Sequence, residues 1–129
     1  MKPEENMHDR QEFQALVTEL RRGSLTIAVL GCLKKPHYGY ALLQTMQEFD
    51  IDIEANTLYP LLRRLEKQEL LASDWDTSES RPRKFYTLST KGEEALQLLI
   101  EEMARMQNSF DLILHNNTGR KKSDESSIS

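Results

Sequence analysis

The sequence predicts a mainly α-helical protein with one small β-hairpin, which places it in the α+β class. Apolar residues recur at helical spacing in four segments of the 129-residue chain, while two short stretches with strand character flank a turn-rich loop. Glycine and proline are scarce, with five and four residues respectively, as expected for a helix-rich protein. The length suits one domain with extensions and makes a large two-domain enzyme improbable.

The first predicted helix spans Asp9 to Arg22. Four residues form its apolar face: Phe13, Leu16, Val17 and Leu20. Gly23 interrupts this pattern and Ser24 is placed to cap a second segment, SLTIAVLGCLKK, although one continuous helix can also pass through the glycine. The second segment has almost no polar face, and its length and Lys-Lys-Pro ending favour a buried helix over a buried strand.

A short amphipathic helix is predicted from Tyr38 to Phe49, followed by a connector over Asp50 to Ala55. The strongest helical pattern runs from Asn56 to about Leu70. Asn56 or Thr57 can cap its start, and Pro60 is tolerable if it lies in the first turn. The face opposite the leucine stripe carries four residues: Asn56, Tyr59, Arg63 and Lys67.

The predicted hairpin pairs Leu71–Trp75 with Arg83–Leu88 across the loop DTSESRP. Thr90 and Glu93 have the spacing of a capping box for a last helix, which runs from about Lys91 to Leu114. Six residues of this helix repeat at a/d spacing over about three heptads, as in a helix that dimerises: Leu96, Leu99, Met103, Met106, Phe110 and Ile113. Residues 1–8 and 115–129 are polar and aperiodic, so we expect disordered tails around residues 9–91 and the dimerisation helix 92–114.

Three helices followed by a hairpin is the element order of a winged helix, in which the third helix enters the major groove of DNA. The chain carries a net charge of −4, which disfavours indiscriminate coating of nucleic acid. Residues 21–91, however, hold eleven basic and nine acidic residues, a net charge of +2. The cations gather on the third helix and near the hairpin tip, where they can neutralise phosphates and release counterions.

Other classes of site find little support. The single cysteine excludes an intrachain disulfide, and Cys32 sits in the most apolar segment, where we expect a buried thiol. His8, His37 and His115 are scattered, so the sequence predicts no metal site and no cofactor. Nucleophile motifs and phosphate-cradling glycine loops are absent, which argues against an enzyme. The chain has no apolar run of membrane-spanning length, so we expect a cytoplasmic protein.

Three stretches carry a resemblance to a known family: LRRGSLTIAVLGCLKKPHYGYALLQTMQEF, NTLYPLLRRLEKQELLASDW and RPRKFYTLSTKGEEAL. In order and spacing they resemble the PadR family of bacterial transcriptional regulators, over roughly Leu20 to Leu96. The resemblance implies a homodimeric winged-helix repressor whose C-terminal helix, often with N-terminal residues, makes the dimer. It also matches Tyr38 and the segment Asn56–Arg63 to the DNA-facing turn and recognition helix, and Arg83 and Lys84 to the basic residues of the wing.

The expected partners are a pseudo-palindromic DNA operator and a second copy of the chain. The candidate DNA contacts lie on the turn, the third helix and the wing: Tyr38, Asn56, Thr57, Tyr59, Pro60, Arg63, Lys67, Arg81, Arg83 and Lys84. Arg64 ranks below Arg63 because its helical angle is nearer the core. The candidate dimer interface joins three residues of the first helix, Phe13, Leu16 and Leu20, to the six seam residues of the last.

Two alternatives remain open from the sequence. The methionine-rich seam can be plain dimer packing or can adapt around a small apolar effector. Multidrug-sensing relatives stack aromatic compounds on a tryptophan of the last helix, whereas the only tryptophan here is Trp75, which we expect in the hairpin core. The third-helix stripe, in turn, can instead meet an acidic protein surface, which would make the chain a winged-helix protein-interaction module.

Overall fold

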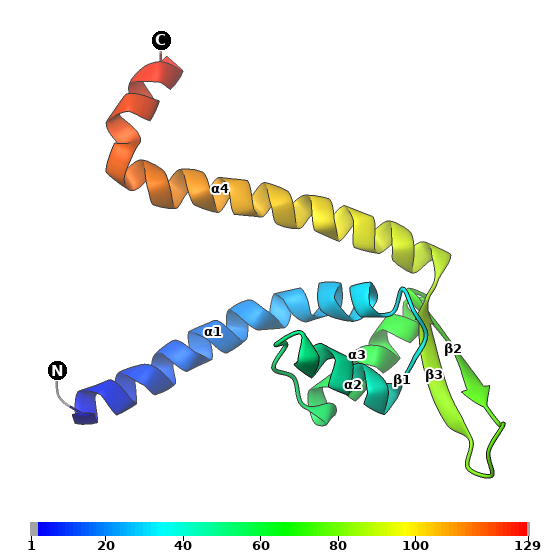
Figure 1. The fold of residues 1–129 in the computed structure, drawn as a ribbon. Helices are drawn as coiled ribbons and strands as arrows, with labels where there is room; N and C mark the ends of the chain where they lie inside the picture. Colours follow the sequence, from blue (N-terminus) through cyan, green and yellow to red (C-terminus); the bar gives the residue numbers. More distant parts are fainter. Residues whose placement is uncertain (1–2, 129) are drawn as a thin grey trace.

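The structure is a computed structural model that describes the backbone of residues 3–128 and the side chains of residues 9–115. The chain folds, in order, as α1 (Pro3–Cys32), β1 (His37–Tyr38), α2 (Gly39–Glu48), α3 (Ala55–Lys67), β2 (Leu71–Asp76), β3 (Arg83–Leu88) and α4 (Thr90–Ile128). Helices α2 and α3 pack with the sheet below the C-terminal half of α1, and α4 lies on the opposite side of α1 (Figure 1). The N-terminal end of α3 and the β2–β3 tip both point away from α4.

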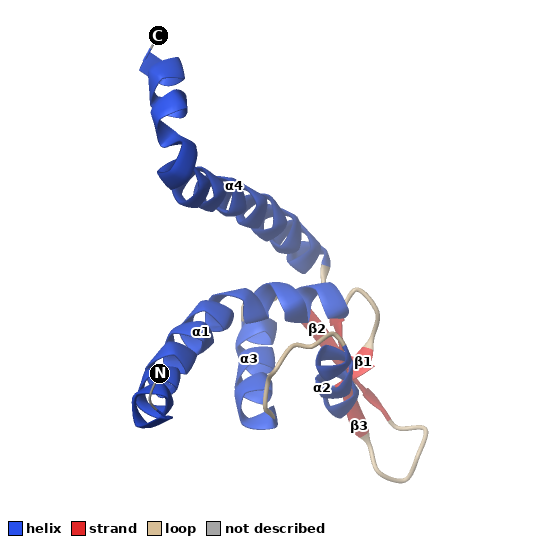
Figure 2. Cartoon of the chain, turned by 60° about the vertical axis from the view of Figure 1, so that its left-hand side comes forward, coloured by secondary structure: helices blue, strands red, loops and turns tan. Residues whose placement is uncertain are grey.

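The mainly helical fold with a small antiparallel sheet is confirmed, and the sheet has one strand more than the sequence predicted. β1 lies next to β3, so the strand order is β1-β3-β2 (Figure 2). His37 pairs with Tyr86 and Tyr38 with Phe85, which places Tyr38 in a strand rather than in the first turn of a helix. The predicted hairpin is confirmed and extends to Asp76, which pairs with Arg83.

Helix α1 is continuous, so the prediction of a separate helix capped at Ser24 is wrong and the uninterrupted alternative holds. The Ser24 hydroxyl donates to the carbonyl of Arg21 one turn back, within the helix. Both long helices also run on into the expected tails, since α1 begins at Pro3 and α4 continues to Ile128. Disorder of residues 1–8 and 115–129 in solution stays a prediction.

The core lies where α1, α2, α3 and the sheet meet. The leucine stripe of α3 is confirmed as its buried face, because Leu58 and Leu62 are fully buried and Leu61 and Leu65 nearly so. They pack with residues of the neighbouring elements: Val29, Leu30, Leu33, Leu42, Met46, Ile53, Leu71, Tyr86 and Leu96. The expectation for Trp75 is wrong, since its side chain is 58% exposed.

Helices α2 and α3 end in the same way, with a left-handed residue that turns the chain. Asp50 has φ 64° and Glu69 has φ 67°, a conformation that usually selects glycine or asparagine. In each turn the following amide reaches back across the helix end, from Ile51 to the Met46 carbonyl at 2.8 Å and from Leu70 to the Leu65 carbonyl at 2.9 Å. These turns set the directions of α3 and β2.

The helix starts differ from the predictions. Glu54, not Asn56 or Thr57, is the N-cap of α3, and no side chain caps that end. Pro60 therefore lies in the second turn of α3, past the position where its missing N–H is harmless. At α4 the cap is Ser89 rather than Thr90: the Ser89 hydroxyl accepts from the Gly92 amide at 2.9 Å and donates to the Glu69 carbonyl at 2.7 Å.

Candidate nucleic-acid interface

The outer face of α3 carries cations without partners. Asn56, Thr57 and Pro60 are exposed near the start of the helix, and Arg63 and Lys67 are exposed further along it. Arg64 is exposed as well, so the structure gives no reason to rank it below Arg63. Among the described side chains, none of these three cations takes part in an ion pair. Their charge is available to an external anion.

Tyr59 is half-buried and packs against the first residue of α2. A Cβ atom added to Gly39 would lie 2.7 Å from the Cε1 atom of Tyr59, so only glycine permits this approach. Tyr59 therefore couples α3 to the start of α2. Its ring lies against the backbone of Gly39, the first residue of α2.

Arg83 lies at the centre of a cluster near the tip of the wing, the β2–β3 hairpin, where it pairs with Asp76. Its guanidinium sits 4.3 Å from the centroid of the Tyr38 ring and donates to the Tyr40 hydroxyl at 3.2 Å. The carboxylates of Asp76 and Glu79 lie 3.7 and 3.5 Å from it. Tyr38 and Tyr40 stack with centroids 5.9 Å apart. In this cluster the Arg83 charge is matched by acidic residues of its own wing.

The Tyr38 hydroxyl donates to the carboxylate of Asp76 across the sheet. This hydrogen bond is the main reason that the pKa of Asp76 falls to about 2, and the amide and hydroxyl of Ser78 contribute. The same contact raises the pKa of Tyr38. The Tyr38 hydroxyl is thus engaged within the chain, although sequence reasoning placed it on DNA.

Lys84 is engaged too, on the other face of the wing. Its ammonium lies 3.2 Å from the carboxylate of Glu66 on α3, and the hydroxyl of Ser73 donates to the same carboxylate. The Ser73 hydrogen bond, followed by Lys84, lowers the pKa of Glu66. The Glu66 carboxylate therefore joins α3 to both long strands of the wing. Arg81 differs, since it is exposed in the loop and forms no ion pair with any described side chain.

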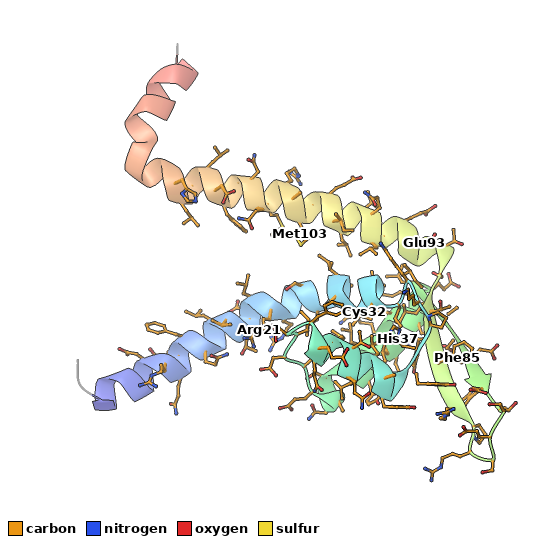
Figure 3. All side chains as sticks on the ribbon, in the orientation of Figure 1. Arg21, Cys32, His37, Phe85, Glu93 and Met103 are labelled. Carbon is orange, nitrogen blue, oxygen red and sulfur yellow. The ribbon has the colours of Figure 1, made fainter. Side chains whose placement is uncertain are left out.

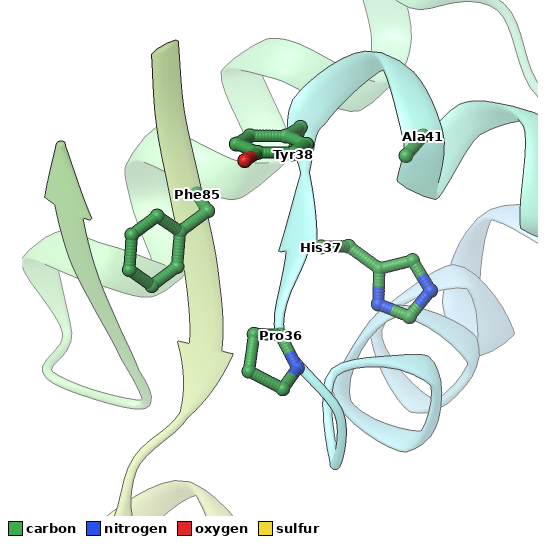
Figure 4. Close-up of a pocket in the computed structure, with 5 residues that line it drawn as sticks. All are labelled: Pro36, His37, Tyr38, Ala41 and Phe85. Atoms are coloured by element: carbon green, nitrogen blue, oxygen red, sulfur yellow. The ribbon is translucent and has the colours of Figure 1, made fainter. Parts of the chain in front are cut away.

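A shallow hollow of about 310 Å³ lies beside β1 on the outer face of the sheet. Tyr38 and Phe85 line it with rings nearly perpendicular, and Pro36, His37 and Ala41 complete its wall (Figure 4). No aspartate, glutamate, lysine or arginine is among the residues that line the hollow. It adjoins the Arg83 cluster.

The family model described as the transcriptional regulator PadR-like family matches residues 29–98, which is more than half of the chain. The chain belongs to the PadR family of transcriptional regulators. The matched segment contains α2, α3, the sheet and the beginning of α4, so the predicted resemblance is confirmed. An uncharacterized protein X from Lysinibacillus sphaericus is 30% identical over 102 residues, covering 75% of this chain and 94% of that protein.

Solved PadR structures share the fold. A PadR family transcriptional regulator from Eggerthella lenta is 42% identical, with a TM-score of 0.80 over 84% of this chain and 96% of that one. A PadR-like transcription factor from Bacteroides fragilis is 32% identical, with a TM-score of 0.66 over 77% and 98% of the two chains. The winged-helix architecture expected from the element order is therefore confirmed.

This PadR-family chain exposes a long apolar surface on α1 and α4. On α1, Phe13, Leu16 and Leu20 are 58, 61 and 75% exposed. On α4, the exposed seam residues are Met103, Met106, Phe110 and Ile113. Leu96 is buried in the core of the single chain and is not available to a partner. Leu99 is half-buried and packs against the same core, so only part of it is available.

A groove of about 380 Å³ runs between α1 and α4. Leu20 and Ile27 line it from α1, and Met103, Met106 and Phe110 line it from α4. Met103 is labelled on the side of α4 that faces α1 in Figure 3. The groove is mostly apolar, with Glu102 and Gln107 at its edge.

The part of the chain that the structure describes offers little to other classes of site. There, no set of three or more His, Cys, Asp or Glu side chains is arranged to hold a metal ion. No helix in this part is long and apolar enough to cross a membrane. Cys32 is half-buried rather than fully buried, and burial raises the pKa of its thiol.

Sequence reasoning missed three residues that shape this interface. Glu66, Asp76 and Tyr40 hold Lys84, Arg83 and Tyr38 in place. Acidic residues within a basic segment are the sequence signal for such partners, because a partly buried cation needs an opposite charge nearby.

Proposed function

We propose that this protein is a sequence-specific DNA-binding transcriptional repressor that acts as a homodimer in the cytoplasm. The observation that carries the proposal is the unpaired basic face of α3 next to the wing, on the side of the molecule away from α4. Family membership supports it, since the family consists of transcriptional regulators. Residues 9–91 would form the DNA-binding unit and residues 92–114 the dimerisation helix.

In the proposed complex, α3 lies in the major groove with its N-terminal end toward the bases. Asn56 and Thr57 offer hydrogen-bonding side chains at that end, and Arg63, Arg64 and Lys67 neutralise the flanking phosphates. The free amides of the first turn favour an anion at the same place, because no side chain caps them. Binding to the operator would block transcription from it.

Dimerisation is supported by the exposed apolar residues of α1 and α4. Four of them, Leu16, Leu20, Met103 and Met106, are between 45 and 75% exposed in the single chain. A two-fold dimer would present two α3 helices to a pseudo-palindrome with half-site centres about 34 Å apart. The N-terminal helix and the seam of α4 then belong to one interface.

A small apolar effector bound in the α1–α4 groove is the proposed release signal. The groove carries methionines, which adapt to irregular ligands, but no tryptophan, so a stacked aromatic sandwich is not expected. Such a ligand must bind the DNA-free dimer more tightly than the DNA-bound one, since otherwise it shifts no equilibrium.

The test compares binding of the purified protein to about 200 base pairs of its own upstream DNA with binding to unrelated DNA of the same length. Arg63→Ala is expected to weaken binding about tenfold and to leave thermal unfolding nearly unchanged, because Arg63 is exposed and unpaired. The control is Arg105→Ala, which removes an exposed cation of α4 that pairs with Glu102 and should leave affinity unchanged.

If upstream DNA binds no better than unrelated DNA at any salt concentration, the repressor proposal fails. Binding of the α3 face to an acidic protein instead would then make the chain a protein-interaction module.

A further inference from the structure

We infer that Trp75 is the contact through which the wing holds DNA, and that Arg83 and Lys84 brace the wing instead of binding phosphate. The inference rests on the proposed DNA-binding function and deepens it by naming the wing residue that touches the duplex. It starts from two observations: the two wing-strand cations are already paired within the chain, and the one tryptophan of the sequence is exposed.

The pairing of Arg83 and Lys84 removes them as ready phosphate ligands. Arg83 faces two carboxylates and two tyrosines, and Lys84 faces Glu66. A phosphate would have to compete with these partners for the two cations. Their interactions instead hold β1, β3 and α3 at fixed relative positions. The exposed wing residues without such partners, Arg81 and Trp75, are the better candidates for a DNA contact.

Trp75 lies on the face of the wing that looks toward α3. It pairs directly across the strands with Lys84, as Ser73 does with Tyr86, so all four side chains share this face. Ser73 and Lys84 both contact Glu66 of α3, which fixes which face it is. The acidic neighbours Asp74 and Asp76 point to the other face, where Asp76 meets Tyr38 and Arg83.

Trp75 lies further out along the wing than the serine that contacts α3. β2 begins near the C-terminal end of α3 and runs outward to the hairpin tip (Figure 1). Trp75 lies two residues beyond Ser73, roughly 6–7 Å further along the strand. Arg63 lies three residues before Glu66, about 4.5 Å along the helix. Trp75 therefore lies on the α3-facing side of the wing, beyond the contact between Ser73 and Glu66.

The Trp75 ring has no aromatic partner among the described side chains, where the ring contacts involve Tyr38, Tyr40 and Phe85. Its exposure of 58% leaves a large apolar surface in water. Exposed cations without an ion pair among the described side chains, Arg63 on α3 and Arg81 in the wing loop, belong to the two elements that flank this face and favour an anionic occupant. Duplex DNA fits both, because an indole can pack on deoxyribose while its N–H donates to a phosphate oxygen.

The experiment uses the full-length protein and the upstream DNA as the probe. Because Trp75 is the only tryptophan, intrinsic fluorescence reports on this one side chain. We expect upstream DNA to change its emission and to reduce its quenching by acrylamide. Trp75→Ala should weaken DNA binding about tenfold, and Trp75→Phe should retain part of the affinity. Phe49→Ala removes a 72% exposed ring from the far end of α2 and should bind like the wild type.

The outcomes separate an error about the role of Trp75 from an error about DNA binding itself. If the wild type does not bind upstream DNA, the function itself fails. If the wild type binds and Trp75→Ala binds within twofold of it, the inference is overturned and the function stands. Emission that changes with protein concentration but not with DNA also overturns it, since a second copy then covers Trp75. If Trp75→Ala does not fold, acrylamide quenching of the wild type still shows whether DNA covers Trp75.

Discussion

Gly92 should be the glycine least tolerant of substitution in this protein. It lies in the first turn of α4, where an added Cβ would stand 2.0 Å from the carbonyl oxygen of Leu70, about 1.4 Å inside the 3.4 Å of ordinary contact. The obstacle is backbone, so the turn at Glu69 and Leu70 has to move. That movement strains two hydrogen bonds, from the Ser89 amide to Leu70 at 3.1 Å and from the Ser89 hydroxyl to Glu69 at 2.7 Å.

The expected cost of Gly92→Ala follows from these contacts. Overpacking costs about 1–3 kcal/mol, and each weakened hydrogen bond adds up to about 1 kcal/mol. The better helix propensity of alanine returns at most about 1 kcal/mol. We therefore expect the free energy of unfolding to fall by about 2–4 kcal/mol in urea titrations followed by circular dichroism, at matched protein concentration.

The matched control is Gly31→Ala, near the end of α1. Apart from its chain neighbours and its own helix backbone, no described atom lies within 4 Å of its added Cβ, so helix propensity should dominate and raise the free energy of unfolding by about 0.5–1 kcal/mol. The two variants make the same chemical change with opposite expected signs. A Gly92→Ala protein as stable as the wild type would refute the argument that α4 docks on the Leu70 carbonyl.

Three further predictions concern the α3 turn, the wing and the dimer. Glu69→Gly should raise the free energy of unfolding, measured in urea, by about 0.5–1 kcal/mol, because Glu69 has φ 67° and glycine adopts this left-handed conformation without strain. An unchanged or lower free energy of unfolding would count against strain at this residue. Tyr38→Phe should raise the pKa of Asp76 from about 2 toward 3.8 in an NMR titration. The lowered pKa of Asp76 stabilises the fold above about pH 4, and this contribution is lost as the pH falls toward 2. Tyr38→Phe should therefore lose less stability than the wild type over that pH range. An unchanged pKa of Asp76 in the variant would contradict the hydrogen bond. Met106→Asp should sediment as a monomer, and an intact dimer would place the interface elsewhere.

The parts of the fold that follow from local pattern were predictable. The buried face of α3 follows from the i, i+3, i+4, i+7 spacing of its leucines, since burial and helical period act together there. β1 was not predictable, because two residues carry no periodicity and the strand exists only through its pairing with β3. The cap of α4 shifted by one residue because Ser89 also bonds to Glu69, a contact that sequence spacing does not encode.

The residues of the candidate site were predictable from the sequence, but the role of each residue was not. The sequence identified the cations of α3 and the wing, yet it could not distinguish Arg63, which is unpaired, from Arg83, which cross-strand and loop carboxylates neutralise. Trp75 was misplaced for a related reason. Strand alternation puts it on the inward face, but the packing on that face ends at the Glu66–Lys84 pair, so the indole remains in water.

In the proposed function, the α3 face and the wing together form a specific DNA-binding surface. Its most direct test is the affinity for upstream DNA measured by fluorescence anisotropy across a series of salt concentrations. With about four to eight phosphate contacts per dimer, the logarithm of the association constant should fall against the logarithm of salt with a slope near −4 to −7. The affinity should also stay above that for unrelated DNA throughout. A slope near zero, or equal affinity for both DNAs at every salt concentration, would contradict the claim.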